Sequence, residues 1–153
     1  MAEPKFVAKP GQVDFTDIRY CPVVNCVVTY KDKILLVERS PELRLYPGLW
    51  NGISGFLDDE QSVEDKAKEE LLEEIFIDES QIVSMKRGKV LIQESEQYHK
   101  TWIVFPVLVE VSTSDFTVDW EAKQGKWYSR DELATLKLTP GFDEVLAEFF
   151  KKQ

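Results

Sequence analysis

Histidine, cysteine and long apolar runs are scarce in this chain, and each scarcity excludes a class of protein. The single histidine, His99, lies in a polar stretch without a G-x-S-x-G or similar nucleophile motif, so neither a Ser-His-Asp nor a Cys-His mechanism is expected. The two cysteines, Cys21 and Cys26, would point to opposite faces of one strand, which favours buried free thiols over a disulfide or a zinc site. Hydrolytic chemistry would therefore depend mainly on carboxylates and a metal ion.

The chain also lacks a basic excess and a membrane span. Its formal net charge is −9, whereas a sequence-independent nucleic-acid binder needs a basic surface, so no polymeric nucleic acid partner is expected. The longest apolar run, residues 103–109, contains Pro106 and is too short to cross a bilayer. The first residues lack the apolar core of a signal peptide. We expect a soluble, cytoplasmic protein with no membrane partner, and the sequence leaves its oligomeric state open.

The length and the apolar content predict a single domain with a mixed sheet and helices. The chain has 153 residues, of which 43% are hydrophobic, enough for one core. We therefore expect one α+β domain over residues 1–153, with residues 1–20 as an N-terminal arm or edge strand. The patterns predict a hairpin at 22–38, a helix from Ser62, strands at 83–93 and 101–111, a short strand and a longer one within 116–129, and helices at 130–136 and 139–150. Pro106 predicts a bulge or an edge position in its strand.

The helix that starts at Ser62 carries an unusual density of acid. Ser62 and Asp65 resemble a capping box, and an apolar stripe is formed by Val63, Ala67, Leu71 and Ile75, with Leu72 beside it. Four glutamates follow on two adjacent turns, at positions 69, 70, 73 and 74. Like charges at this spacing destabilise a helix, and the stripe places Glu70 and Glu74 at the edge of the buried face. A bound divalent cation would relieve that repulsion, although a solvated acidic face remains the alternative.

The loop that precedes this helix contains candidate binding residues. Residues 39–55 are punctuated by proline and glycine and carry Arg44, Tyr46 and Trp50. Loops with arginine and aromatic residues beside a rigid element are common binding surfaces, so these three side chains are candidate substrate contacts. Tyr98 and Trp102 are further candidates for stacking on a base. Each of them is equally compatible with a role in the core or on the surface.

Residues 55–77 resemble the Nudix box, whose pattern is G-x5-E-x7-R-E-U-x-E-E-x-G-U with U a bulky aliphatic residue. Six of the nine specified positions match: Gly55, Glu70, Leu71, Glu73, Glu74 and Ile77. The residues Pro-Gly-Leu-Trp at 47–50 resemble the run that commonly precedes the box, and residues 127–133 resemble its downstream pattern of a tryptophan followed by a short helix. The resemblance implies a Nudix-like α/β/α sandwich with the mixed sheet between helices.

The resemblance also implies a set of site residues. Glu73 and Glu74 would be metal ligands, and Glu70 would be a metal ligand or the catalytic base that activates water. The backbone carbonyl of Ser54 would be a further ligand. Family members often add an acidic residue from outside the box, for which Glu121 is our choice, with Glu94 and Glu96 as alternatives. The implied cofactor is Mg²⁺ or Mn²⁺, which would neutralise charge on the phosphates and lower the pKa of water.

Three positions depart from the box. Gln61 replaces its first glutamate, Glu69 replaces its arginine, and Phe76 replaces its second glycine. In the family the arginine pairs with nearby glutamates and orients the catalytic ones, so Glu69 adds a negative charge where a cation is usual. Lys66 can offset part of that charge through an i,i+3 contact. Phe76 disfavours a left-handed exit from the helix, so we expect the helix to end differently from the usual one.

Two functions from different classes follow from the resemblance. The first is a metal-dependent hydrolase of a nucleoside diphosphate linked to another group, a small phosphoanhydride, weakened by the departures at Gln61, Glu69 and Phe76. The alternative is a catalytically silent Nudix-fold module that binds a nucleotide or another protein. An acidic α+β domain without phosphate chemistry is the third interpretation. The sequence does not identify the substrate.

Overall fold

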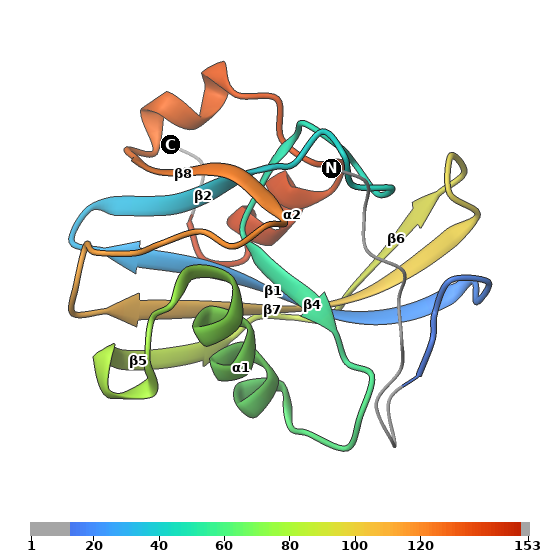
Figure 1. Ribbon diagram of the computed structural model, residues 1–153, viewed down its shortest axis with the longest axis horizontal. Coiled ribbons are helices and arrows are strands. Elements are labelled where there is room, and N and C mark those ends of the chain that lie inside the picture. The colour runs from blue at the N-terminus through green and yellow to red at the C-terminus, as the bar shows by residue number, and fades with distance from the viewer. Residues whose placement is uncertain (1–12, 151–153) are drawn as a thin grey trace.

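Two long strands, β1 (Tyr20–Tyr30) and β7 (Lys100–Val111), run parallel at the centre of an eight-stranded mixed sheet (Figure 1). The computed structural model of the chain describes residues 13–150. The other strands are β2 (Lys33–Arg39), β3 (Trp50–Asn51), β4 (Ile53–Phe56), β5 (Ile82–Arg87), β6 (Leu91–Ser95) and β8 (Ala122–Tyr128). Two α-helices, α1 (Val63–Ile75) and α2 (Phe142–Ala147), and two 3₁₀ helices, η1 (Glu79–Gln81) and η2 (Asp131–Thr135), complete the described part.

The sheet separates two apolar layers, because alternate side chains of a strand point to opposite faces. On β1, Val24 and Cys26 pack in the layer that contains α1, whereas Cys21 and Val27 pack in the layer that contains α2. Figure 1 shows α1 on the near face of the sheet and α2 on the far face. The expected arrangement of a mixed sheet between helices is therefore confirmed. Both cysteines are buried and free, on opposite faces as predicted.

Helix α1 begins where the sequence predicts. Ser62 has extended backbone angles and its side chain accepts a hydrogen bond from the Asp65 N–H at 3.1 Å, which satisfies one of the first backbone donors of the helix. The stripe of Val63, Ala67, Leu71 and Ile75 is buried against the sheet, as expected. Leu72, which we placed beside the stripe, is instead 51% exposed, because it lies on the outer side of the helix.

The expectation for the C-terminal end of α1 was wrong. Phe76 adopts a left-handed conformation, with φ of 57°, and its N–H donates to the Leu72 carbonyl at 3.2 Å. The next N–H, from Ile77, donates to the Leu71 carbonyl at 3.2 Å, and the Ile77 side chain is fully buried. The helix therefore ends as a glycine-capped helix does, although the residue is phenylalanine, and burial of Ile77 stabilises this conformation against its intrinsic cost.

Pro106 lies neither on an edge strand nor at a bulge of β7. β7 is flanked by β1 on one side and by β5 and β6 on the other. β6 pairs with residues 100–104 and β5 with residues 107–111, so Pro106, which has no N–H to donate, faces the interruption between these two strands. The predicted strand at 83–93 is accordingly divided into β5 and β6, and the Gly88 N–H in the gap donates to the Pro106 carbonyl at 2.9 Å.

Other elements differ from the predictions mainly at their ends. The hairpin of β1 and β2 is confirmed, and its turn at Lys31 and Asp32 is the predicted one. No strand forms at 116–118, and only β8 forms within 116–129. The predicted helix at 130–136 is the short 3₁₀ helix η2, and α2 starts after Gly141 rather than at Pro140. Of the N-terminal arm, residues 1–12 lie outside the described residues, and residues 13–19 form no strand.

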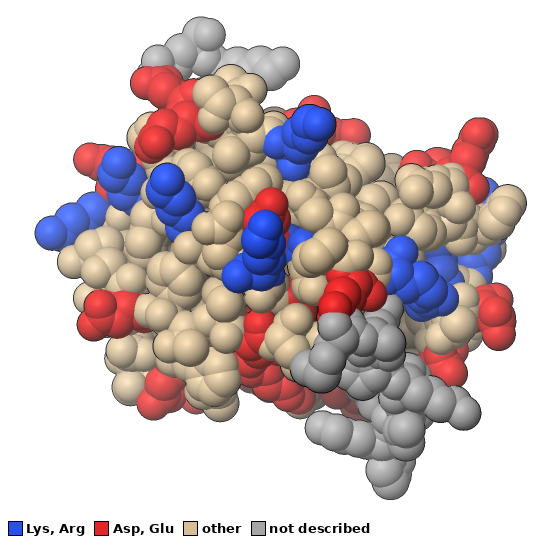
Figure 2. Space-filling view, turned by 45° about the horizontal axis from the view of Figure 1, so that its top comes forward, with Lys and Arg blue, Asp and Glu red and all other residues tan. Residues whose placement is uncertain are grey.

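The surface shows no basic footprint on the face in view. Figure 2 shows lysine and arginine side chains interspersed with acidic ones, without a large continuous patch of either sign. That distribution agrees with the net charge of −9 and gives no platform for a polyanion on this face. Neither α1 nor any other helix within residues 13–150 is long and apolar enough to cross a membrane.

Candidate active site

Glu70 of α1 faces the short strand β4. The Glu70 side chain packs directly against Gly55, where a Cβ atom would overlap the Glu70 carboxyl group. Gly55 is thus needed for space at this position. Ser54 directly precedes Gly55 on β4. This strand pairs antiparallel with β1, with Ser54 opposite Asn25. The strand therefore brings the Ser54 backbone and the Glu70 carboxyl group to one place.

Another acidic side chain, that of Glu121, reaches Glu70 from the segment before β8. The Thr117 N–H donates to the Ile75 carbonyl at 3.2 Å and the Asp119 N–H donates to the Glu74 carbonyl at 3.1 Å. These backbone bonds hold residues 117–121 against the last turn of α1. Glu121 then lies close enough to Glu70 and Glu74 to raise the pKa of both carboxyl groups through its charge.

The two alternatives to Glu121 lie elsewhere. Glu94 forms an ion pair with Arg19 at 2.9 Å and accepts a hydrogen bond from Thr101 at 2.8 Å. Glu96 is exposed in the turn between β6 and β7. Neither side chain lines the cleft described below. Asp119, which the sequence did not bring to attention, lies beside Glu121 and accepts a hydrogen bond from the Glu121 N–H at 3.0 Å.

Three carboxyl groups of this cluster, those of Glu70, Glu74 and Asp119, have raised pKa values. Burial raises the pKa of Glu70 to about 8, and the charges of Glu73 and Glu121 contribute to the rise. Burial also raises the pKa of Glu74 well above its ordinary value, with further contributions from Glu70 and Glu121. The pKa of Asp119 rises to about 6 through burial and the nearby charge of Glu121. Burial and mutual repulsion therefore favour the neutral forms of Glu70, Glu74 and Asp119.

The donor set fits a divalent cation. Glu74 Oε2 is buried and has no hydrogen-bond partner within residues 13–150, an arrangement that is costly for a carboxylate unless a cation or a proton is present. Carboxylate oxygens and a backbone carbonyl are the ligands that Mg²⁺ and Mn²⁺ prefer. Within the described residues, no group of three or more His, Cys, Asp or Glu side chains is arranged so that it could hold a metal ion. The fit therefore rests on charge, ligand chemistry and the unpaired oxygen of Glu74.

An open cleft of about 700 Å³ extends from this cluster across the sheet. Near the carboxylate cluster it is lined by Ser54, Gly55, Glu70, Glu73 and Glu121, whereas Glu74 is not among the lining residues. Its other end is lined by aromatic and amide side chains from β1, β4, β6 and β7 and from the loops around them. The cleft thus joins a carboxylate cluster to a surface that suits a planar ligand.

Aromatic side chains form one wall of the cleft. The rings of Phe15 and Phe56 are stacked with centroids 5.1 Å apart, and the Phe56 ring lies 6.1 Å from that of Trp102. Trp102 Nε1 donates to the Tyr46 hydroxyl at 3.0 Å, and the Tyr46 N–H donates to the Tyr98 hydroxyl at 2.9 Å. These bonds fix the loop that contains Tyr46, whose backbone has a positive φ of 48°, against the tip of β6 and β7.

Amide side chains line the cleft near its floor. Asn25 Nδ2 donates to Asn51 Oδ1 at 3.1 Å, and Asn51 Nδ2 in turn donates to Ser54 Oγ at 3.3 Å. Thr139 Oγ1 also donates to Asn51 Oδ1, at 3.0 Å. These bonds orient the Asn25 amide and leave its Oδ1 buried without a partner among the described residues. Asn25 Oδ1 is therefore a buried acceptor without a partner, on a residue that lines the cleft.

The three predicted substrate residues divide into two groups. Arg44 and Tyr46 line the cleft, whereas Trp50 does not. The Trp50 ring instead packs edge-on against Tyr128, with centroids 5.3 Å apart, in the apolar layer beneath α2. His99 is exposed in a turn and does not line the cleft. Arg39, Gln93 and Trp120 also line the cleft, and no local pattern identified them, because their position depends on contacts distant in sequence.

The chain is similar to proteins of one family. The family model described as NUDIX domain matches residues 19–149. The NUDIX domain of Shewanella oneidensis NrtR, solved with ADP ribose, has a TM-score of 0.71 at 17% identity and covers 83% of this chain and 84% of that one. A NUDIX hydrolase from Nitrosomonas europaea gives 0.70 at 21% identity, with coverage of 86% and 88%. An Ap4A hydrolase from C. elegans gives 0.68 at 19% identity, with coverage of 84% and 94%. No curated protein matches the chain in sequence.

Proposed function

Because the chain belongs to the Nudix hydrolase family, we propose that it uses Mg²⁺ or Mn²⁺ to cleave the pyrophosphate bond of a nucleoside diphosphate linked to another group. The observation that carries this proposal is the cleft, which joins a cluster of carboxyl groups, two of them with raised pKa values, to an aromatic and amide surface. A nucleotide has the matching polarity, since its phosphates need cations and its base is planar and carries N–H groups.

The residues that would hold the metal ion are Glu70, Glu73, Glu74, Glu121 and the backbone carbonyl of Ser54. When bound, the ion would neutralise charge on the phosphates and lower the pKa of an attacking water molecule. Glu70 is also our choice for the general base. In the metal-free protein the pKa of its carboxyl group is about 8, and a bound cation would lower that pKa and so favour the carboxylate form that a base needs. Gly55 keeps that carboxyl group against β4 by leaving room for it.

The rest of the substrate would lie along the cleft. Phe56 and Trp102 offer aromatic surface for stacking, and Asn25 Oδ1 would accept a hydrogen bond from an N–H of the ligand. Arg44 lines the cleft and would contact phosphate or ribose oxygens. Trp50 is left out of this assignment because it packs on Tyr128. One similar structure was solved with ADP ribose and another is an Ap4A hydrolase, so both of these compounds belong in the substrate panel.

A turnover screen tests the proposal. The parent protein is incubated with nucleoside diphosphate sugars, dinucleoside polyphosphates and nucleoside triphosphates, with Mg²⁺ and with Mn²⁺, and the release of mononucleotide or phosphate is measured. We expect hydrolysis that requires the metal ion and is lost in Glu70→Gln. Asp65→Asn, an exposed carboxylate on the same helix, is the matched control and should retain activity. Metal-independent release, or full activity in Glu70→Gln, would contradict the proposal.

A catalytically silent module is the alternative function, and the replacement of the first glutamate of the box by Gln61 favours it. The same panel distinguishes the two. If no compound is hydrolysed while calorimetry still detects nucleotide binding that Trp102→Ala weakens, the chain is a binding module. Turnover that is lost in Glu70→Gln excludes that alternative.

A further inference from the structure

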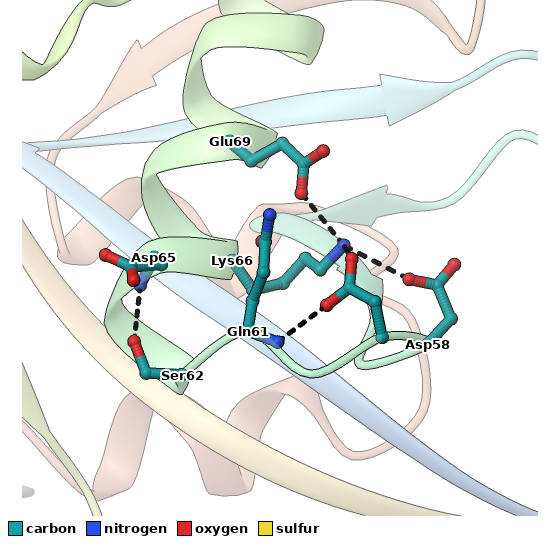
Figure 3. A network of polar contacts seen from close by, with 7 residues as sticks. Asp58, Gln61, Ser62, Asp65, Lys66 and Glu69 are labelled. Atoms are coloured by element: carbon teal, nitrogen blue, oxygen red, sulfur yellow. Dashed lines mark hydrogen bonds and ion pairs between the residues drawn. The ribbon is translucent and has the colours of Figure 1, made fainter. Parts of the chain in front are cut away.

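Lys66 occupies a position that is rare for a lysine, since its side chain is almost fully buried within the Nudix box. The residue is 3% exposed, and its Nζ lies 2.9 Å from Glu69, 3.1 Å from Asp58 and 3.2 Å from Asp59 (Figure 3). Asp58 is itself 6% exposed. Burial alone would lower the pKa of Lys66, but the hydrogen bonds to Glu69, Asp58 and Asp59 raise it above its ordinary value, so the ammonium group stays charged.

These four residues connect two parts of the candidate active site. Asp58 and Asp59 belong to residues 57–62, the segment that links β4 to α1, whereas Lys66 and Glu69 lie on the first turns of α1. β4 carries Ser54 and Gly55, and α1 carries Glu70 one residue after Glu69. The segment is held further by the Leu57 N–H, which donates to the Pro22 carbonyl, and by the Gln61 N–H, which donates to Asp59 Oδ1, both at 2.9 Å. We name Lys66, Asp58, Asp59 and Glu69 the Lys66 clamp.

The polarity of this clamp is the reverse of the family pattern. The pattern has a cation at position 69 and an acid at position 61, and this chain has an acid at 69, a neutral Gln61 and the cation at 66. Because side chains three residues apart in a helix are neighbours, Lys66 and Glu69 reach the same region of space that one arginine would fill. Glu69 shares the Lys66 ammonium group with Asp58 and Asp59, so part of its charge beside Glu70 is offset.

We propose that Lys66 replaces the arginine of the Nudix box as a positioning residue, and that the clamp holds β4 and α1 at the spacing which the site needs. The catalytic part of this inference rests on the proposed function, whereas the clamp itself can be tested without substrate. Restoring the family residue by Glu69→Arg is then expected to damage the site. It would remove a carboxylate from Lys66 and place a second cation three residues away.

The first experiment measures the clamp in the metal-free protein by amide hydrogen exchange. The reporters are the amides of Leu57 and Gln61, whose hydrogen bonds depend on the position of the 57–62 segment. Glu69→Arg and Lys66→Met should exchange faster at these amides than the parent, while Lys66→Arg should preserve their protection. Lys68→Met is the matched control. Lys68 lies on the same helix but pairs with Glu79 of η1, so this substitution should leave the exchange of both amides unchanged.

The second experiment measures Mn²⁺ affinity and steady-state kinetics of the same variants. We expect Glu69→Arg and Lys66→Met to weaken Mn²⁺ binding by about tenfold or more and to lower kcat more than they raise KM, with Lys66→Arg close to the parent. Should Lys66→Met fail to fold, Glu69→Arg and Glu69→Gln carry the test. A parent that binds Mn²⁺ but hydrolyses nothing contradicts the proposed function alone. Unchanged exchange in Glu69→Arg, or higher activity than the parent, overturns the clamp.

Discussion

Replacing Glu70 by glutamine should stabilise the metal-free protein at alkaline pH. The pKa of Glu70 is about 8 in the folded protein, against 4.5 for an ordinary glutamate. A carboxyl group with a raised pKa contributes stability that is fully present below about pH 4.5 and is lost as the pH rises through about 8. In this window the folded parent must either retain a proton that the unfolded chain releases or carry a buried charge. Glutamine removes that cost because it is neutral and of similar shape.

The size of the effect follows from the shift. Each unit of pKa corresponds to about 1.4 kcal/mol, so the difference between about 8 and 4.5 gives an upper value of about 4 to 5 kcal/mol. Glu70 is partly exposed, and relaxation of the neighbouring acids reduces this value, so we expect Glu70→Gln to raise the free energy of unfolding by about 2 to 4 kcal/mol near pH 8. Near pH 5 the gain should shrink to below about 1 kcal/mol.

Urea unfolding in the presence of EDTA measures this gain. The parent and Glu70→Gln are compared at several values from about pH 5 to about pH 8, with Asp65→Asn as the exposed control on the same helix. Millimolar Mg²⁺ should then raise the stability of the parent more than that of Glu70→Gln, because only the parent has the full set of carboxylates. A gain that does not change with pH, or a less stable Glu70→Gln at pH 8 in EDTA, would refute the electrostatic reasoning.

Three further substitutions probe other contacts. Gly55→Ala should lower kcat by about 100-fold in steady-state assays while circular dichroism stays unchanged, because the new Cβ displaces Glu70; an unaltered kcat would contradict this packing. Phe76→Gly should raise the free energy of unfolding in urea by about 1 kcal/mol, since glycine adopts a φ of 57° without strain, and a loss of stability would show that the Phe76 ring matters more. Asn25→Leu should raise KM about tenfold with little change in kcat, and an unchanged KM would show that Asn25 Oδ1 contacts no ligand.

Local patterns predicted the features that depend on neighbours in sequence. The Ser62 cap and the buried stripe of α1 follow from residue types at helical spacing. The role of Glu70 was suggested by the resemblance to the Nudix box and stays a prediction, although the structure does place its carboxyl group against Gly55. The i,i+3 contact of Lys66 with Glu69 was predicted from helical spacing and is present at 2.9 Å. Such features need only the geometry of one helix.

Features that depend on contacts distant in sequence were predicted less well. The exit of α1 was wrong because the burial of Ile77 overrides the preference of Phe76, and no local pattern reports that burial. The choice of Glu121 rested on its distance from Trp127, but its position is set by backbone bonds from residues 117 and 119 to the end of α1. The contribution of Asp58 and Asp59 to the Lys66 clamp was missed, because it depends on the path of the 57–62 segment.

The two cysteines provide the molecule with a pair of internal chemical probes. Cys26 lies in the layer beneath α1, where burial and the charges of Glu70 and Glu74 raise its pKa, whereas Cys21 lies in the layer beneath α2. A buried thiol reacts with an alkylating reagent only when its surroundings open. The labelling rate of each cysteine therefore reports how often the layer around that cysteine opens. An ion bound at the carboxylates should therefore slow the labelling of Cys26 more than that of Cys21, and so separate local tightening around the glutamates from stabilisation of the whole protein.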